Sequence, residues 1–245
     1  MQPYYYLSTF YDILQEEIDY RSWYRVLRQK IDELGYTAEH ILEVGAGTGN
    51  MTALFIEDKF KVTALEPCEA MLSALVDKLY ERRRQLKYFC GELKDFQTAQ
   101  KYDAIVGFLD VLNYIEDSAL DNFFNCLAAR LKVGGFAYFD WSTEYKLKEI
   151  IGDHTFAESL ADFAYIWENQ YDATRRLLDF DITVFLEESA GLYSKQVERH
   201  RQFAHRVENL RAALPKELKL IGVWGDDFAP VQPNDQRNHI IIERI

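Results

Sequence analysis

Hydrophobic and polar positions follow a helical period in the first part of the chain. Residues 10–34 place apolar side chains at helical spacing, which predicts N-terminal helices that stop at Gly35. From residue 40 onward, short apolar runs alternate with amphipathic stretches. These runs predict strands at 40–44, 61–66, 86–90, 102–109 and 134–142. Strands that alternate with helices at this spacing predict a parallel sheet covered by helices on both faces.

The helix before the fifth strand has the clearest amphipathic pattern. Apolar side chains from Leu120 to Leu131 fall on one face, and Asp117 or Ser118 is the expected N-cap.

Beyond residue 143 the period changes from helical to alternating. Three runs, within 163–171, 178–186 and 197–202, alternate apolar or aromatic with polar positions. Such runs predict a small antiparallel sheet. The pattern then returns to a helix near 203–213 and to strands at 218–225 and 238–245.

We therefore expect an α/β fold with a doubly wound, mostly parallel seven-stranded sheet. N-terminal cap helices are expected over 1–35. The main domain is expected to comprise residues 1–143 and 200–245. Residues 144–199 are expected to form an inserted antiparallel β lid.

Composition narrows the class of function. The chain has 245 residues, of which 48% are hydrophobic and 28% charged, and its formal net charge is −12. Such a charge disfavours nucleic acid and anionic membranes as partners and favours a small molecule or a protein. The three cysteines, Cys68, Cys90 and Cys126, form no CxxC pair, which argues against a zinc site or a disulfide framework and indicates a cytoplasmic location. The start of the sequence lacks a signal-peptide pattern.

A glycine-rich loop, EVGAGTGN (43–50), joins the first predicted strand to the following helix. Such a loop lets a ligand approach the backbone and the free N–H groups of the helix. A tight turn without a ligand is the plain alternative. The dinucleotide fingerprint G-x-G-x-x-G fails, because Asn50 stands where its third glycine belongs. Glu66 ends the next strand, where a carboxylate can accept ribose hydroxyls, so a nucleoside ligand is expected.

The pattern E-x-G-x-G-x-G resembles motif I of the class I S-adenosylmethionine-dependent methyltransferases, which have a Rossmann-like domain. Further segments resemble the same family in order and spacing: EPCEAML (66–72), CGELKDF (90–96), YDAIVGFLDVLNYI (102–115) and LKVGGFAYFD (131–140). Y-D-x-L at 11–14 and Y-x-x-W at 20–23 are similar to the bacterial subgroup of glycine and amino-sugar N-methyltransferases. Cys68, Glu92 and Val133 depart from the family pattern without removing a group that methyl transfer needs.

The resemblance implies S-adenosyl-L-methionine as the cofactor and S-adenosyl-L-homocysteine as its product, with no metal. In the family, the methionine end of the cofactor lies along the glycine loop and near N-terminal aromatic residues. The adenine lies near the segment that matches Glu92 and Leu93, and Phe108 forms the floor of the methyl-donor pocket. The implied cofactor residues are Tyr11, Tyr20, Trp23, Glu43, Gly45, Ala46, Gly47, Gly49, Glu66, Pro67, Met71, Gly91, Glu92, Leu93 and Phe108.

Catalytic candidates follow from position and residue type. Asp110 and Asn113 come directly after the fourth strand, at the edge of an open α/β sheet where ligands bind. His200 lies beside Glu198 on the polar face of a predicted strand, and a histidine near a carboxylate can exchange protons near neutral pH. Helix capping for Asp110 and a surface position for His200 are the plain alternatives.

Aromatic residues are the candidates for binding the methyl acceptor. Tyr114 follows the fourth strand, and Trp167 and Tyr171 lie in the insertion. A core aromatic stripe is the alternative for the last two. We expect the insertion to close the acceptor side and the N-terminal helices to close the cofactor side.

The favoured function is methyl transfer to a small-molecule acceptor, with the subgroup resemblance favouring an amine. A non-catalytic S-adenosylmethionine-binding module on the same fold is the alternative. A nicotinamide-dependent oxidoreductase is disfavoured by Asn50, and an RNA methyltransferase by the negative charge. The acceptor, the atom methylated and the oligomeric state stay open.

Overall fold

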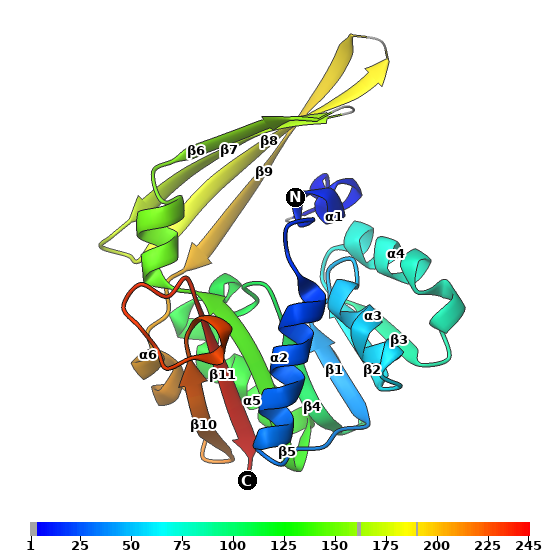
Figure 1. Cartoon of the computed structure of the whole chain (residues 1–245), viewed down its shortest axis with the longest axis vertical. Helices are drawn as coiled ribbons and strands as arrows, with labels where there is room; N and C mark the ends of the chain where they lie inside the picture. The colour runs from blue at the N-terminus through cyan, green and yellow to red at the C-terminus, as the bar shows by residue number, and fades with distance from the viewer. Residues whose placement is uncertain (1–3, 161–162, 190) are drawn as a thin grey trace.

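Two β-sheets organise the chain (Figure 1). The computed structural model describes residues 4–160, 163–189 and 191–245. The larger sheet has seven strands in the order β10-β11-β5-β4-β1-β2-β3. Their bounds are His40–Val44 (β1), Lys61–Glu66 (β2), Leu86–Cys90 (β3), Tyr102–Gly107 (β4), Leu131–Ser142 (β5), Leu218–Trp224 (β10) and Arg237–Arg244 (β11). Strands β1 to β5 pair in parallel and β11 runs antiparallel to both neighbours, so the predicted mostly parallel sheet is confirmed.

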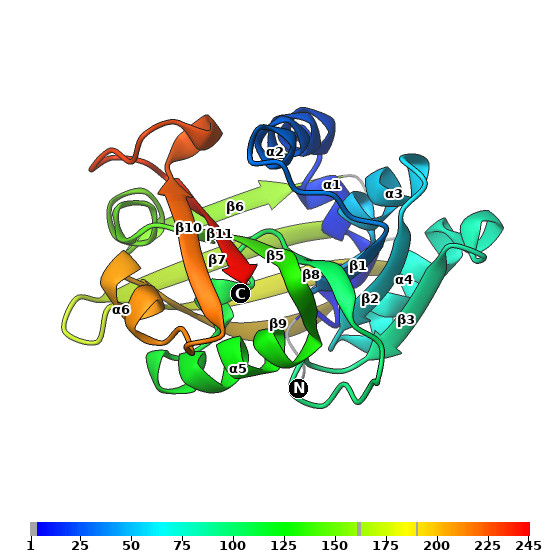
Figure 2. The same cartoon turned by 90° about the horizontal axis from the view of Figure 1, so that it is seen from below.

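Helices cover both faces of this sheet (Figure 2). Apolar side chains of α2 (Tyr20–Glu33), α3 (Asn50–Glu57) and α4 (Glu69–Lys78) pack in one core. Those of α5 (Leu120–Arg130) and α6 (Val207–Ala212) pack in a second core against the other face. The central strands are buried on both sides, which explains why their sequences read as continuous apolar runs. A short helix, α1 (Tyr11–Leu14), precedes α2.

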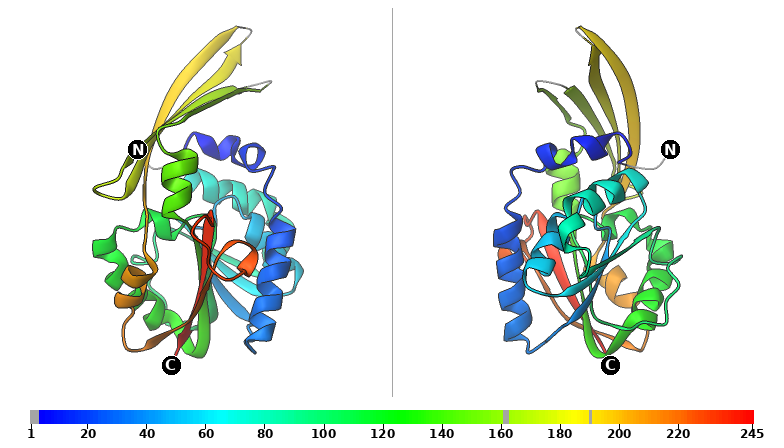
Figure 3. Two further views of the ribbon diagram at one scale, coloured as in Figure 1. Left: turned by 60° about the vertical axis from the view of Figure 1, so that its left-hand side comes forward. Right: turned by 90° about the vertical axis from the view of Figure 1, so that its right-hand side faces the viewer.

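The second sheet has four antiparallel strands in the order β6-β7-β8-β9. Their bounds are Thr155–Ser159 (β6), Phe163–Asp172 (β7), Leu177–Ser189 (β8) and Leu192–Phe203 (β9). This sheet lies beyond the carboxyl ends of the parallel strands, next to the N-terminal segment, and its β8–β9 hairpin projects from the body (Figure 3). The inserted antiparallel sheet is therefore confirmed.

Three details differ from the sequence-based expectation. Strand β6 was not predicted, and β9 continues to Phe203, so residues 200–203 lie in the second sheet. Helix α5 begins at Leu120 with Ala119 in the N-cap position and no side-chain cap bond, so the expected N-cap was wrong. The Asp117 carboxylate instead contacts His205 Nδ1 at 2.7 Å and accepts a hydrogen bond from Asn209 at 2.7 Å.

Within the described ranges, no helix is long and apolar enough to cross a membrane. Across the same ranges, no group of histidine, cysteine or acidic side chains is arranged to hold a metal ion. Cys68, Cys90 and Cys126 are all free thiols.

Candidate active site

A cavity of about 630 Å³ lies at the carboxyl ends of β1, β2 and β4, beside the N-terminal segment. Most of the residues expected to bind the cofactor line this cavity: Tyr11, Tyr20, Glu43, Gly45, Ala46, Gly47, Glu66, Pro67, Met71, Gly91, Glu92, Leu93 and Phe108. Tyr114, an expected acceptor residue, lines it as well. The parallel sheet thus gathers motifs from five separate segments around one space.

The glycine loop turns sharply because its three glycines adopt positive φ angles. Gly45, at φ 69°, lies so close to the β4 loop that an added Cβ would be 2.7 Å from Cγ2 of Val111. Gly49, at φ 85°, is the N-cap of α3, and its Cβ would be 2.7 Å from Cγ of Leu75. Gly49 therefore serves the close packing of α3 on α4, rather than lining the cavity as expected.

Glu66 is buried at the end of β2, with both carboxylate oxygens facing backbone donors. Gly47 N–H donates to one oxygen at 2.9 Å and Cys68 N–H to the other at 2.9 Å. Burial raises the pKa of Glu66, and these two N–H groups oppose that rise. Each oxygen keeps lone pairs that can accept a hydroxyl, so the side chain can bind the ribose of a nucleoside.

Acidic and aromatic groups dominate the wall of the cavity. Glu43 is buried there and accepts a 2.6 Å hydrogen bond from Thr52, and burial raises its pKa to about 8. Lys94 is the one cation among the described lining residues, and its ammonium lies 2.7 Å from a carboxylate oxygen of Glu92. The phenol rings of Tyr4, Tyr11, Tyr20 and Tyr114 complete the wall. These acidic and aromatic groups suit a cationic sulfonium, through charge and cation–π attraction.

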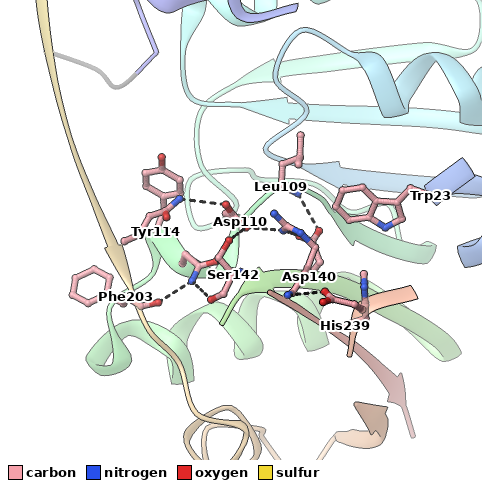
Figure 4. A network of polar contacts seen from close by, with 12 residues as sticks. Trp23, Leu109, Asp110, Tyr114, Asp140, Ser142, Phe203 and His239 are labelled. Carbon is pink, nitrogen blue, oxygen red and sulfur yellow. Dashed lines mark hydrogen bonds and ion pairs between the residues drawn. The ribbon is translucent and has the colours of Figure 1, made fainter. Parts of the chain in front are cut away.

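The β4 end forms the floor, and its backbone is strained. Leu109 and Asp110 have consecutive positive φ angles of 55° and 74°. Leu109 N–H donates to Asp140 at 3.0 Å, and Arg237 from β11 bonds to both Asp110, at 2.6 Å, and Asp140 (Figure 4). One buried guanidinium between two carboxylates therefore holds the strained turn.

Asp110 does not line the cavity as a free base. Burial acts to raise its pKa, but the Arg237 cation holds that pKa below its usual value. Its carboxylate also accepts a hydrogen bond from Ser142 Oγ at 2.9 Å. These contacts assign Asp110 to the support of the floor.

Asn113, the second catalytic candidate, is completely buried. Its amide donates to the carbonyl oxygens of Ser142 and Phe203, at 3.0 and 2.9 Å, and accepts from Ser142 N–H at 2.8 Å (Figure 4). All of its bonds are therefore to backbone. The side chain joins the β4 loop to β5 and β9 instead of facing a substrate.

Three expected aromatic contacts lie away from the cavity. Trp23 donates to the Tyr138 hydroxyl at 3.0 Å and lies 5.2 Å from the Arg237 guanidinium. Trp167 and Tyr171 pack in the small core between the second sheet and the helical turn Lys146–Ile151. The Tyr171 hydroxyl donates to Glu144 at 3.0 Å. The alternative of a core stripe is the one that the structure favours for these two.

His200, the third catalytic candidate, belongs to β9 of the second sheet. Its side chain is buried between Glu198 and Tyr114, with Nε2 at 3.2 Å from Glu198 and Nδ1 at 3.3 Å from the Tyr114 hydroxyl. His200 therefore adjoins the cavity through Tyr114 and through Tyr4, whose ring centroid lies 4.8 Å from that of the imidazole.

The sequence-based expectation missed Tyr4, Glu198 and Arg237 as site residues. Glu198 was noticed only as a neighbour of His200. Arg237 lies in the segment QPNDQRNH (232–239), which had no family counterpart to explain it. Arg237 is the first residue of β11 (RNHIIIER), whose start is polar, so the local pattern did not mark it out.

Comparison with known proteins agrees with this geometry. A family model described as a methyltransferase domain matches residues 41–135. A protein of Geobacillus sp. (strain WCH70), named a putative methyltransferase, is 26% identical over 235 residues and covers 95% of each chain.

Solved structures extend the likeness over both sheets. An S-adenosylmethionine-dependent methyltransferase from Clostridium acetobutylicum ATCC 824 superposes with a TM-score of 0.84 at 23% identity, and the match covers 98% of each chain. The sugar N-methyltransferase KedS8 from Streptoalloteichus sp. ATCC 53650 gives a TM-score of 0.76 at 17% identity, covering 96% of this chain and 93% of that one.

The matched family segment contains the glycine loop, Glu66 and the β4 end, which together build the cavity. S-adenosylmethionine is accordingly the cofactor, and the residues present suit it. Residues 41–135 match a methyltransferase domain, and nearly the whole chain is similar to named methyltransferases, one of them S-adenosylmethionine-dependent.

Proposed function

We propose that the enzyme methylates an amine nitrogen of a small molecule that binds between the cofactor and the second sheet. The position of the N-terminal segment is the observation that supports a small molecule as the methyl acceptor. Backbone N–H groups of Tyr4, Tyr6 and Leu7 donate to the Glu198 carboxylate in β9, so this segment passes beside the cavity and is fastened to the second sheet. An enclosed site of this kind admits a small acceptor more readily than a polymer.

The charge of the cavity wall and the similarity to a known enzyme support an amine as the methyl acceptor. The described lining carries the carboxylates of Glu66, Glu92 and Glu116 against Lys94, besides Glu43, which burial keeps protonated near neutral pH, so the local potential favours a cationic ligand. KedS8, a sugar N-methyltransferase, has the same fold. We propose that the second sheet acts as the acceptor-side lid and that the free thiols reflect a reducing cytoplasm.

The cofactor supplies an electrophilic methyl group and a thioether leaving group. The chain has to bring the amine into line with the sulfur–methyl bond, and such positioning contributes about 7–11 kcal/mol to lowering a barrier. Glu66 and the glycine loop would hold the nucleoside and the methionine end. Tyr4, Tyr11 and Tyr114 would orient the acceptor and exclude water.

A first experiment tests binding. Thermal unfolding is recorded with S-adenosylmethionine, S-adenosylhomocysteine and NAD in parallel. A ligand at about 100 times its Kd stabilises the fold by about 2.7 kcal/mol, so the two sulfur ligands should raise Tm by several degrees and NAD should not. A shift with NAD alone would contradict the cofactor assignment.

A second experiment tests the acceptor. Release of S-adenosylhomocysteine is measured with glycine, ethanolamine, putrescine and glucosamine, each beside its hydroxyl counterpart: glycolate, ethylene glycol, 1,4-butanediol and glucose. We expect turnover with at least one amine and none with its counterpart. Binding of the cofactor without turnover on any amine would reject the proposed acceptor class and favour a non-catalytic module.

A further inference from the structure

Four side chains form a continuous hydrogen-bonded chain from the cavity to a buried carboxylate. The hydroxyls of Tyr4 and Tyr114, both of which line the cavity, lie 2.5 Å apart. The Tyr114 hydroxyl lies 3.3 Å from His200 Nδ1, and His200 Nε2 lies 3.2 Å from Glu198 Oε2. These hydrogen bonds thus join three parts of the sequence: the N-terminal segment, the turn Leu112–Tyr114 after β4, and β9.

The histidine in this chain is held in one orientation. Its side chain has no exposed surface, and its ring stacks on Phe180 of β8 with an interplanar angle of 1° and a centroid distance of 4.8 Å. A stacked and buried ring has one plane available for its two hydrogen bonds. Each ring nitrogen therefore keeps its own partner.

The carboxylate at the end of the chain is built to stay charged. Burial acts to raise the pKa of Glu198, but hydrogen bonds from His200 and from the backbone N–H groups of Tyr4, Tyr6 and Leu7 lower it below its ordinary value. A carboxylate ion accepts and does not donate, so His200 Nε2 carries the proton and Nδ1 accepts from Tyr114. The hydrogen bonds themselves therefore select the tautomer of His200.

We propose that Tyr114 is the catalytic residue that takes the proton of the acceptor amine, and that it passes its own phenolic proton to His200, whose imidazolium is stabilised by Glu198. This inference rests on the proposed function, because only an acceptor that bears a proton needs such a path. Tyr114 touches the acceptor. His200 and Glu198 act through it and are positioning residues.

The step balances in atoms and charge. The bound ammonium of the acceptor first gives one N–H proton to the Tyr114 oxygen while the Tyr114 O–H proton moves to His200 Nδ1. The nitrogen lone pair that this frees then forms the new bond to the methyl carbon, and the electron pair of the breaking carbon–sulfur bond stays on sulfur. Tyr114 ends as a neutral phenol and His200 as an imidazolium beside an anionic Glu198. The proton later returns to solvent when the product leaves.

Transfer through a neutral phenol fits the surroundings of Tyr114 better than a stored phenolate. Burial raises the pKa of Tyr114, and the nearby Asp110 charge and the Tyr11 phenol raise it further. Tyr4 is affected in the same direction by burial, Tyr114, Asp110 and Glu66. These groups, with Glu198 on β9, are the ionisable side chains that face the relay.

The first test observes His200 directly and does not depend on the acceptor. Protein labelled with ¹⁵N-histidine and saturated with S-adenosylhomocysteine is titrated by NMR, and the His200 signals are assigned from their loss in His200→Gln. We expect a neutral Nε2–H tautomer at high pH, protonation at Nδ1 on acidification, and a changed Nδ1 shift in Tyr114→Phe. A neutral Nδ1–H tautomer, or an Nδ1 signal unaffected by Tyr114→Phe, would overturn the relay.

The second test is kinetic and uses the amine with the highest turnover among the four named above. Tyr114→Phe and His200→Gln should each lower kcat at least about 100-fold, with the Kd for S-adenosylhomocysteine within about threefold of the wild type. Tyr171→Phe removes a phenol from the same lid outside the cavity and should leave kcat unchanged. The acid limb of the kcat–pH profile, which reports protonation of the proton acceptor, should disappear in His200→Gln.

Different failures have different meanings. Wild-type protein that turns over none of the four amines contradicts the proposed function, whereas the NMR titration still decides the relay. Normal kcat in Tyr114→Phe with an active amine contradicts the relay and leaves the proposed function standing. Thermal unfolding of each variant shows whether it is folded. If His200→Gln is not folded, the result with Tyr114→Phe decides whether the relay exists.

Discussion

The two sides of the cavity are built by different means. The cofactor side comes from a short stretch, residues 43–93, and much of it is backbone: glycine turns, a helix start and N–H groups that meet Glu66. The acceptor side comes from side chains far apart in the chain, such as Tyr4 and Glu198, which are 194 residues apart. Local backbone geometry specifies one constant ligand, whereas long-range contacts between side chains allow the other ligand to differ among relatives.

The largest expected effect concerns the floor that both sides share. Arg237→Met leaves Asp110 and Asp140 buried without their cation, which should lower the free energy of unfolding by about 3–5 kcal/mol. Urea unfolding measures this loss. Adding Asp140→Asn to the same variant should recover part of it, because one of the two stranded charges is then gone. A loss below about 1 kcal/mol would mean that the ion pairs do not support the floor.

The cofactor side should respond to pH through Glu43. Burial raises its pKa to about 8, so the native state keeps a proton that the unfolded chain releases near the ordinary value of 4.5. The native state then binds more protons between these values, and stability falls as pH rises through that range, by on the order of 5 kcal/mol.

Glu43→Gln keeps an acceptor for Thr52 and cannot ionise. The variant should match the wild type near pH 5 and exceed its stability at pH 9. Urea midpoints at both pH values provide the measurement. An equal pH dependence in the two proteins would show that Glu43 is not the responsible group.

A smaller effect is expected on cofactor affinity when Glu66 is changed. Glu66→Gln replaces a charged acceptor, and a hydrogen bond to a charged group contributes about 1.5–3 kcal/mol, so the Kd for S-adenosylhomocysteine should rise about 10- to 100-fold. Calorimetric titration measures the change. Glu39→Gln is the matched control, because that exposed carboxylate is paired with Lys61 and does not line the cavity, and its Kd should change less than threefold. Equal losses in both variants would contradict the assignment of Glu66.

The smallest expected effect is on the lid side. Tyr171→Phe removes the hydrogen bond to Glu144 and should cost about 0.5–1.5 kcal/mol of stability. The KM for the acceptor should stay unchanged, because the residue packs in the core of the second sheet. A raised KM without a loss of stability would restore Tyr171 as an acceptor residue.

Sequence patterns predicted the strands of the main sheet closely. Strands β1, β2 and β3 have the predicted bounds, because each is a short run between turn residues. Strands β1 and β2 are enclosed by a neighbour on each side, whereas β3 lies at the edge of the sheet beside β2. The glycine loop and Glu66 were also predictable, since their geometry depends on residues close in sequence. Both were then found on the wall of one cavity.

The acceptor side was harder to predict for a physical reason. Alternation along β7 shows that Trp167 faces inward but cannot distinguish a cavity from a core. Asp110 was taken for a base because its partner, Arg237, is 127 residues away and belongs to the last strand. No local signal indicates that Tyr4 meets Glu198.

The fastening of the N-terminal segment has a consequence for the order of events in catalysis. Tyr4, Tyr6 and Leu7 donate to a strand of the second sheet, while Tyr4 and Tyr11 form part of the cavity wall. The nucleoside has to enter before these bonds form and to leave after they break. We therefore expect an ordered reaction, in which the spent nucleoside departs last and its escape limits the steady-state rate, as lid opening does in many enzymes.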